Sequence, residues 1–303
     1  SRARPTMVRR IVWAALVATV AAEGSCNATN TTKPGFLSSI FGGLFKPAAK
    51  PMLHYFDIRG RAEAIRMALA DNGVEWEDAA FSGEDWGKER TDGIKANWTT
   101  EGRIAFGQVP LLEIDGLKLV QSQAILRYLG RKLKWYTGSP ATLAQIDIIA
   151  EGTEDVRKML GAIRYSTNTS REKQTMVTQY FQEPEKGPRW IKFFENIIKA
   201  SKTEFMAGTP RPTHADYLVL DLLDLHDAQN YNNAFDGLPD CAVSEGKIFT
   251  DILLAERKTL KKWREMMRHR PKLKAYLTGP DRRDKPCDGL GHPRLDMPIG
   301  QVY

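Results

Sequence analysis

The first regular pattern in the chain is a short apolar run that changes into a helical repeat. Residues 53–56 are mostly apolar or aromatic, which is typical of a β-strand. Beyond Gly60, apolar positions recur at spacings of three and four, which predicts an amphipathic helix that ends at Gly73. Alternating apolar and polar side chains over residues 74–79 predict a second strand. The pattern is therefore strand, helix, strand, with Tyr55 at the mouth of the first turn.

A hairpin and a further helix follow a polar segment. Residues 82–104 are polar and rich in glycine, so they predict a long irregular loop. Two apolar runs then flank Asp115-Gly116, a dipeptide that favours a two-residue hairpin turn. Pro110 opens the first of these strands, because proline is excluded from the interior of a sheet. The next helix has Ser122 near its N-terminus.

The order of these elements is typical of a thioredoxin-like domain. A thioredoxin-type redox enzyme would need a cysteine where Tyr55 stands, so dithiol chemistry is disfavoured. A tyrosine followed by arginines at a strand-to-helix turn indicates an anion site, since such turns hold anionic ligands in α/β proteins. From this stretch alone, a half-buried core tyrosine beside a basic surface loop is the simpler interpretation.

Strand patterns disappear beyond residue 141, where the chain becomes helical. Helical repeats cover residues 142–165, 171–201, 247–268 and 270–277. Residues 213–216 form a capping box, in which the Thr213 hydroxyl and the Asp216 carboxylate each satisfy a free backbone N–H. This box opens an apolar helix over residues 217–223. The second half of the chain is thus predicted to be all-α.

Length and composition allow two domains behind a leader. The 303 residues, 42% hydrophobic and 27% charged, have the composition of a soluble globular protein. The predicted fold class is α/β plus all-α, an N-terminal thioredoxin-like domain followed by a C-terminal helical bundle domain. The predicted segments are upstream residues and a signal peptide (1–22), a linker or leader (23–50), the thioredoxin-like domain (51–134), the helical domain (141–279) and a loosely held, flexible tail (280–303).

The N-terminal residues have the three parts of a secretory signal peptide. Met7 is followed by two arginines, an apolar run and a small-residue exit near Ala22. The apolar run is short for a membrane span, so no stable span is expected after cleavage. Asn-x-Ser/Thr sequons begin at Asn27, Asn30, Asn97 and Asn168. They fit a secretory location, the endoplasmic reticulum or outside the cell, while the Ser-rich, acid-poor segment after the leader leaves a plastid address open.

The net charge and the cysteine positions exclude some classes of partner but do not identify one. The net charge is +7, but no basic run alternates with aromatic side chains, so nucleic acid is not expected as a partner. Cys26, Cys241 and Cys287 lie far apart and show neither a CxxC motif nor zinc spacing. No metal site is therefore predicted.

Five local motifs resemble those of the cytosolic-type glutathione transferases, in the same order along the chain. In order, they resemble the family's first strand and turn, its loop with a cis-proline, the pair that holds the γ-glutamyl end of glutathione, a fourth-helix segment and a helix cap. These motifs lie at residues 55–63, 106–110, 121–122, 151–155 and 213–216. The resemblance covers roughly residues 51–278. The Arg-Gly-Arg-Ala-Glu turn favours a sigma-like, pi-related class.

The resemblance implies a glutathione site. It implies that Tyr55 donates its O–H to the glutathione sulfur, which favours the thiolate because a hydrogen bond to a charged form lowers the pKa. The thiolate is the nucleophile in conjugation. Gln121 and Ser122, at a helix N-terminus, suit the γ-glutamyl carboxylate. The backbone of Val109, before a cis Pro110, suits the cysteinyl amide.

Further ligands are implied around the rest of glutathione. They are Arg61, Trp86, Lys95 and Gln108. Lys88 and Arg90 compete with Lys95, because this loop is longer than in sigma and pi relatives. Asp155 resembles the acid that reaches the ammonium group from the partner subunit. Each of these residues also has a structural alternative that stays open. The alternatives are bracing of the helix by Arg61, loop packing for Trp86, surface amides for Gln108 and Gln121, a helix N-cap for Ser122, and a solvated helix acid for Asp155.

The resemblance also implies an electrophile pocket between the domains, near Phe56, Ile163 and Tyr165, although ordinary core packing explains these residues equally well. Phe106 resembles an aromatic residue that contacts the neighbouring subunit, which implies a homodimer; its alternative is an intrachain core residue. The implied activity is detoxification by conjugation of glutathione, the co-substrate, to hydrophobic electrophilic small molecules. A glutathione-dependent isomerase similar to prostaglandin D synthase and a non-catalytic binding or structural relative remain as alternatives.

Overall fold

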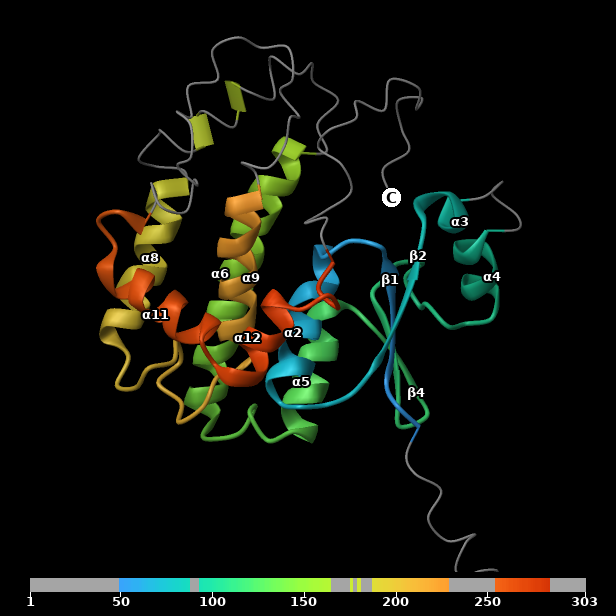
Figure 1. Cartoon of the computed structure of the whole chain (residues 1–303), viewed down its shortest axis with the longest axis horizontal. Helices are drawn as coiled ribbons and strands as arrows, with labels where there is room; N and C mark the ends of the chain where they lie inside the picture. The colour runs from blue at the N-terminus through green and yellow to red at the C-terminus, as the bar shows by residue number, and fades with distance from the viewer. Residues whose placement is uncertain are drawn as a thin grey trace, which may run out of the picture. The chain divides into compact units, whose positions relative to one another are not determined.

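The computed structural model describes residues 49–87, 93–164, 175–176, 179–180, 187–228 and 254–283 (Figure 1). The predicted signal peptide and the sequons at Asn27, Asn30 and Asn168 lie outside these residues. The secretory and plastid locations therefore stay predictions. Among the helices in these ranges, none combines the length and the apolar composition needed to cross a membrane.

One mixed sheet forms the centre of the N-terminal half. Its strands are β1 (Met52–Phe56), β2 (Glu77–Phe81), β3 (Leu111–Ile114) and β4 (Leu117–Val120). The order is β2-β1-β3-β4, with β1 parallel to β2 and antiparallel to β3, and β3 antiparallel to β4. Asp115 and Gly116 have φ values of 53° and 76°, the left-handed backbone that a type I′ turn requires. The predicted hairpin is confirmed.

Helices cover both faces of this sheet. They are η1 (Gly60–Ala62), α2 (Glu63–Asp71), α3 (Gly83–Gly87), α4 (Ile94–Thr100) and α5 (Ser122–Lys132). In Figure 1, α2 and α5 lie on the side of the sheet that faces the helical half, whereas α3 and α4 lie on the other side. Leu53 and Leu112 belong to the core under α2 and α5, and Trp86, Ile104 and Leu111 form a second buried cluster.

The prediction of an irregular loop over residues 82–104 is wrong. This segment contains α3 and α4, and Trp86, Ile94 and Trp98 turn inward from it onto the second cluster. The few apolar side chains are spaced too widely among polar ones to show a periodic pattern, yet they are enough to cover one face of a small sheet. The order of strands and α-helices is therefore β-α-β-α-α-β-β-α.

The second half is helical, as predicted. Its helices are α6 (Pro140–Arg164), α8 (Gly187–Ala200), α9 (His214–Ala228), α11 (Lys258–Arg268) and α12 (Pro271–Thr278). Helix α9 packs against α6 and also against α2, and α12 packs against α2 (Figure 1). The thioredoxin-like half and the helical half therefore meet along α2. The predicted fold class, α/β plus all-α, is confirmed.

The helix caps differ in detail from the prediction. Asp216 accepts the backbone N–H of Thr213 at 2.8 Å, as a capping box requires, and also that of Met206 at 2.9 Å. The Thr213 hydroxyl does not accept a backbone N–H in this arrangement; it donates to the Asp216 carboxylate at 3.1 Å. The box thus ties the start of α9 to the preceding loop as well as to itself.

Two predicted helices are shorter than expected. Helix α11 begins at Lys258, and Glu195 of α8 accepts the N–H groups of Thr259 and Leu260 at 3.3 and 2.6 Å. The cap comes from a distant helix, so the local pattern over residues 247–268 could not show where the helix starts. Helix α8 begins at Gly187, which places Pro188 in its first turn. Proline is tolerated there because its missing N–H has no intrahelical partner.

Candidate active site

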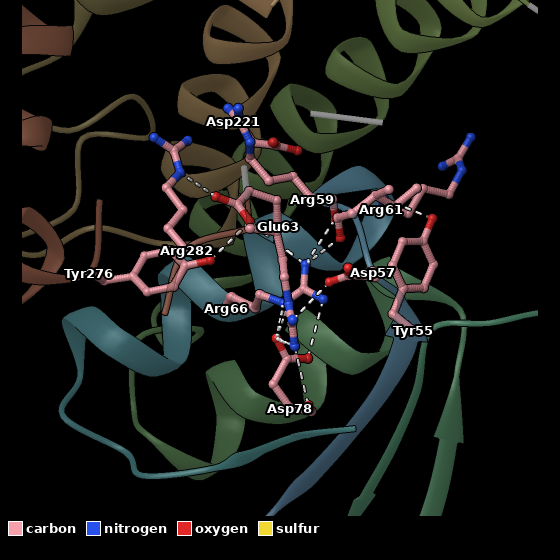
Figure 2. Close-up of polar contacts among 12 residues, drawn as sticks. Tyr55, Asp57, Arg59, Arg61, Glu63, Arg66, Asp78, Asp221, Tyr276 and Arg282 are labelled. Atoms are coloured by element: carbon pink, nitrogen blue, oxygen red, sulfur yellow. Dashed lines mark hydrogen bonds and ion pairs between the residues drawn. The ribbon is translucent and has the colours of Figure 1, made fainter. Parts of the chain in front are cut away.

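Tyr55 is held by the turn that follows it. The side chain is 7% exposed, and its Oη accepts the backbone N–H of Arg61 at 3.1 Å (Figure 2). Gly60 has φ +46°, and a Cβ at this position would lie 2.6 Å from Tyr55 Cε1 and 2.8 Å from Tyr55 Oη. Only glycine gives both that backbone and that close approach. Gly60, which separates the strand pattern from the helical repeat in the sequence, is therefore the residue that lets the turn close over the phenol.

This hydrogen bond sets what the phenol can do chemically. A hydroxyl oxygen that accepts an N–H becomes a better donor of its own proton, because hydrogen bonds in a chain polarise one another. The turn also fixes the direction of the Tyr55 C–O bond, so the hydroxyl is oriented before any ligand arrives. A pre-oriented donor of this kind stabilises an anion without having to reorganise.

Arg61 braces the turn against the helical half. Its two terminal nitrogens donate to both carboxylate oxygens of Glu154 on α6, at 2.9 and 2.8 Å. Such a bidentate pair has a defined geometry as well as a charge. The contact favours the bracing interpretation of Arg61, and its role as a glutathione ligand remains a proposal. Glu154 was not predicted from the sequence, in which its only signal is its place beside Asp155 in the fourth-helix motif.

The loop before β3 has the expected backbone. The Val109–Pro110 peptide bond is cis, as predicted. Gln108 is exposed, Val109 is half-buried and Pro110 is buried. The Lys95 side chain of α4 lies beside this loop, since a Cβ on Gly107 would be 3.6 Å from Lys95 Cε. The structure thus places Lys95 beside Gly107 of this loop, whereas Lys88 and Arg90 lie outside the described residues.

The start of α5 is strained. Gln121 is the N-cap, with φ 70°, and its side chain makes no capping hydrogen bond. A non-glycine residue at positive φ costs energy and is often found at ligand sites. Ser122 is half-buried and is the first helical residue, so the alternative that it is the N-cap is wrong. An uncapped N-terminus of an eleven-residue helix favours binding of a carboxylate.

Trp86 and Phe56 belong to an aromatic cluster. Trp86 is 3% exposed and stacks on Phe81 with ring centroids 5.5 Å apart, and the Phe56 ring lies edge-on to it at 5.7 Å. A side chain this buried has little surface left for a ligand. The arrangement favours a packing role for Trp86 rather than glutathione binding. It likewise favours a packing role for Phe56 rather than a place in the electrophile pocket.

The remaining candidates fall at the surface or outside the described residues. Asp155 is exposed on α6, 3.7 Å from Lys158. Phe106 is 70% exposed, so the alternative of an intrachain core residue is wrong. Tyr165 and the side chain of Ile163 lie outside the described residues. Over the ranges that the structure describes, no three His, Cys, Asp or Glu side chains gather as metal ligands would.

Comparisons with known proteins agree with this fold. Residues 51–131 match the family model for the glutathione S-transferase N-terminal domain, and residues 154–279 match that for the C-terminal domain. Glutathione S-transferase A2 of Mus musculus is 37% identical over 177 residues, 58% of this chain and 73% of the relative. A pi-class glutathione S-transferase from Onchocerca volvulus has a similar structure, with a TM-score of 0.58, 25% identity, and coverage of 76% of this chain and 92% of that one.

The chain belongs to the glutathione S-transferase family and is a transferase of the cytosolic type. The family assignment made from the motifs is confirmed. The sigma-like class stays a prediction, since the relatives above carry A and pi names. A prostaglandin synthase D from Nilaparvata lugens also has this fold, with a TM-score of 0.58 over 76% of this chain and 97% of that one. Its 22% identity shows the fold alone.

Proposed function

We propose that this chain conjugates the thiolate of glutathione to hydrophobic electrophilic small molecules, with Tyr55 as the hydrogen-bond donor to sulfur. The observation that carries the proposal is the Tyr55 turn, in which a buried phenol accepts the Arg61 N–H at 3.1 Å and is locked by Gly60. Family membership supports the use of glutathione. Glutathione acts as a co-substrate, and the proposed chemistry needs no metal.

The chemistry follows from the acidity of a thiol. A free thiol has a pKa of about 8.5, so only a small fraction is ionised at neutral pH. A hydrogen bond from Tyr55 Oη to the sulfur stabilises the thiolate and lowers that pKa, and the thiol proton passes to solvent. The thiolate then attacks the electrophilic carbon and forms the carbon–sulfur bond, while the leaving group departs with its electron pair.

The rest of glutathione is proposed to bind along the cis-proline loop and the start of α5. Ser122 and Gln121 are proposed to hold the γ-glutamyl carboxylate, and the Val109 backbone to pair with the cysteinyl amide. Lys95 lies beside the same loop, which supports it as the cation near the glycyl end. Detoxification is the physiological role that this chemistry serves.

The activity is tested with purified protein, glutathione and chlorodinitrobenzene. Conjugation is measured by absorbance, and the product is identified by mass. An adduct containing glutathione supports the proposal. A rearranged product without an adduct, from an endoperoxide substrate, would instead favour the isomerase. Binding of glutathione without turnover of any electrophile would favour a non-catalytic relative and contradict the proposal.

Replacement of Ser122 by alanine is expected to raise KM for glutathione roughly tenfold, because a hydrogen bond to a charged group is lost. The value of kcat should change little, since the bond is made in the ground state and in the transition state alike. Steady-state kinetics with varied glutathione measure both. Ser139→Ala is the matched control, because the Ser139 hydroxyl caps α6 by accepting Thr142 N–H at 3.1 Å. An unchanged KM in Ser122→Ala would contradict the assignment.

A homodimer is proposed from the exposure of Phe106. Large apolar side chains at 70% exposure mark contact surfaces when they gather with others, and the family commonly forms dimers. Phe106→Ala is expected to weaken dimerisation by about 2 kcal/mol, or roughly 30-fold. Analytical ultracentrifugation over a dilution series measures it. Phe193→Ala on α8, where the side chain is 41% exposed, is the control; equal dimerisation of the two variants would contradict this role.

A further inference from the structure

The first residues of the predicted tail are bound tightly. Beyond α12, the Arg282 side chain reaches between the two halves of the protein: Nε donates to Glu63 Oε1 at 2.8 Å and a terminal nitrogen to Asp224 Oδ2 at 2.7 Å. Its side chain is only 12% exposed. The prediction of a loosely held tail from residue 280 is therefore wrong as far as Arg283, and residues 284–303 lie outside the described residues.

Arg283 reaches the turn that follows Tyr55. One terminal nitrogen donates to Asp57 Oδ1 at 2.8 Å, Nε donates to Asp78 Oδ2 at 3.2 Å, and the other terminal nitrogen donates to the Asp78 carbonyl at 3.3 Å. Asp57 is two residues beyond Tyr55, and Asp78 lies on β2 opposite Leu53 of β1. A guanidinium at the end of the helical half thus binds two carboxylates of the thioredoxin-like half.

Arg66 holds the same turn from inside. It donates to both oxygens of Asp78 at 2.9 and 3.2 Å and, with a third nitrogen, to the carbonyls of Ile58 and Arg59 at 2.9 and 3.1 Å. Figure 2 shows Arg66 and Asp78 directed toward each other below the turn, with Asp57 beside them. Asp78 is therefore shared by two guanidiniums, one fully buried and one partly exposed.

These contacts form a continuous connection to the Tyr55 hydroxyl. Arg283 fixes Asp57 at the start of the turn, Arg66 fixes the carbonyls in its middle, and the Arg61 N–H at its end donates to Tyr55 Oη. Glu63 neighbours Arg66 at 3.7 Å and also accepts the Tyr276 hydroxyl at 2.9 Å, so the inner charges are compensated. Two contacts hold this turn from the helical half: Glu154 with Arg61 at its end, and Arg283 with Asp57 at its start.

We propose that Arg283 is a positioning residue for thiolate formation, acting through Asp57 on the turn that orients the Tyr55 hydroxyl. The inference rests on the proposed function, because it concerns the geometry of the same hydroxyl. It assigns the C-terminal segment a part in the chemistry of the N-terminal half. Loss of the contact lets the turn relax, which lengthens or misdirects the hydrogen bond to sulfur and raises the pKa of bound glutathione.

The test compares Arg283→Gln, Asp57→Asn and the double variant with the wild-type chain. With glutathione saturating, kcat/KM for chlorodinitrobenzene is measured against pH, and thiolate absorbance of the bound tripeptide is titrated in parallel. In each variant, the midpoint of the thiolate titration is expected to rise by about half a pH unit. Turnover is then about threefold lower than in the wild type below the midpoint and unchanged well above it. The double variant should match Arg283→Gln, because the contact between Arg283 and Asp57 is already lost in that variant.

The controls separate positioning from a general loss of structure. Lys274→Gln removes an exposed charge from α12 itself and should leave the midpoint where it is. The Asp57 side chain is 60% exposed, so Asp57→Asn keeps the inference testable if Arg283→Gln fails to fold. An equal loss at every pH, or additive effects in the double variant, would overturn the inference.

The outcome also distinguishes this inference from the proposed function. A wild-type midpoint well below that of free glutathione, with superimposable profiles for both single variants, would overturn the role of Arg283 alone. A wild-type midpoint equal to that of free glutathione would overturn both, because no stabilised thiolate would then exist for the turn to position.

Discussion

Replacement of Tyr55 by phenylalanine is expected to lower turnover of chlorodinitrobenzene at neutral pH by about 100-fold, the lower end of the range for removal of one pre-oriented donor. The ring stays in its buried place against Gly60, so the variant should fold. Affinity for glutathione should change by no more than a few-fold, because the other proposed contacts are untouched. Turnover, glutathione affinity and thermal unfolding measure the three quantities.

The pH dependence of turnover in Tyr55→Phe tests the role of the phenol more specifically. Without the phenol, the bound thiol should titrate close to the pKa of a free thiol, about 8.5. The loss of turnover should therefore be largest at neutral and lower pH and should shrink above pH 9. Tyr128→Phe is the control, since that phenol donates to Asp115 at 2.5 Å in the same half. If Tyr55→Phe keeps the wild-type profile, Tyr55 is not the sulfur ligand.

The parts of the fold that the sequence predicted are those set by short-range chemistry. The strand, the break at Gly60 and the following helix are visible because a change of period and a glycine occur within a dozen residues. The Asp115-Gly116 hairpin was predictable for the same reason, and both residues adopt the left-handed backbone. Tyr55 could be placed at the turn from this pattern, although its hydrogen bond to the Arg61 N–H could not.

The segment between β2 and β3 was mispredicted because few of its side chains are buried. Trp86 is almost fully buried, but the neighbouring residues of α3 are exposed and polar. A helix of five residues offers too few positions to show a period. Whether Trp86 contacts a ligand or packs on Phe81 depends on the sheet face beneath it, which appears only in three dimensions.

The buried charges could not be predicted because their partners are far apart in sequence. Glu63 and Arg66 are fully buried, although charged residues are rarely buried unless paired. Glu63 is paired with Arg282, 219 residues away, and with Tyr276, 213 residues away. A composition rich in Pro, Gly and charge therefore predicted a loose tail, when its first arginines are the partners that these carboxylates need.

One carboxylate of this network is shared by three arginine side chains. Asp224 on α9 is 4% exposed and accepts hydrogen bonds from three guanidiniums, those of Arg264 at 2.9 Å, Arg268 at 2.7 Å and Arg282 at 2.7 Å. Burial alone would raise the pKa of this carboxyl, but the three cations, Arg268 foremost, outweigh burial and hold the pKa below its usual value. It joins α9, α11 and the C-terminal segment.

Asp224→Asn is expected to lower the free energy of unfolding by about 3–5 kcal/mol, because it removes a shared counter-charge from three partly buried cations. The folded-state pKa lies below the unfolded value, so this contribution is present above about pH 4 and is lost as the pH falls through the folded pKa. The difference between wild type and variant should therefore be constant at neutral pH and shrink in acid. Denaturant unfolding at several pH values measures it.

Glu204→Gln, which removes an exposed carboxylate, is the matched control and should change the free energy of unfolding by no more than about 0.5 kcal/mol. Combining Asp224→Asn with Arg268→Gln should cost less than the sum of the two single changes, because the second change removes one of the cations that the first left unpaired. Additive losses, or a loss in Asp224→Asn no larger than in Glu204→Gln, would show that these ion pairs do not hold α9, α11 and Arg282 together.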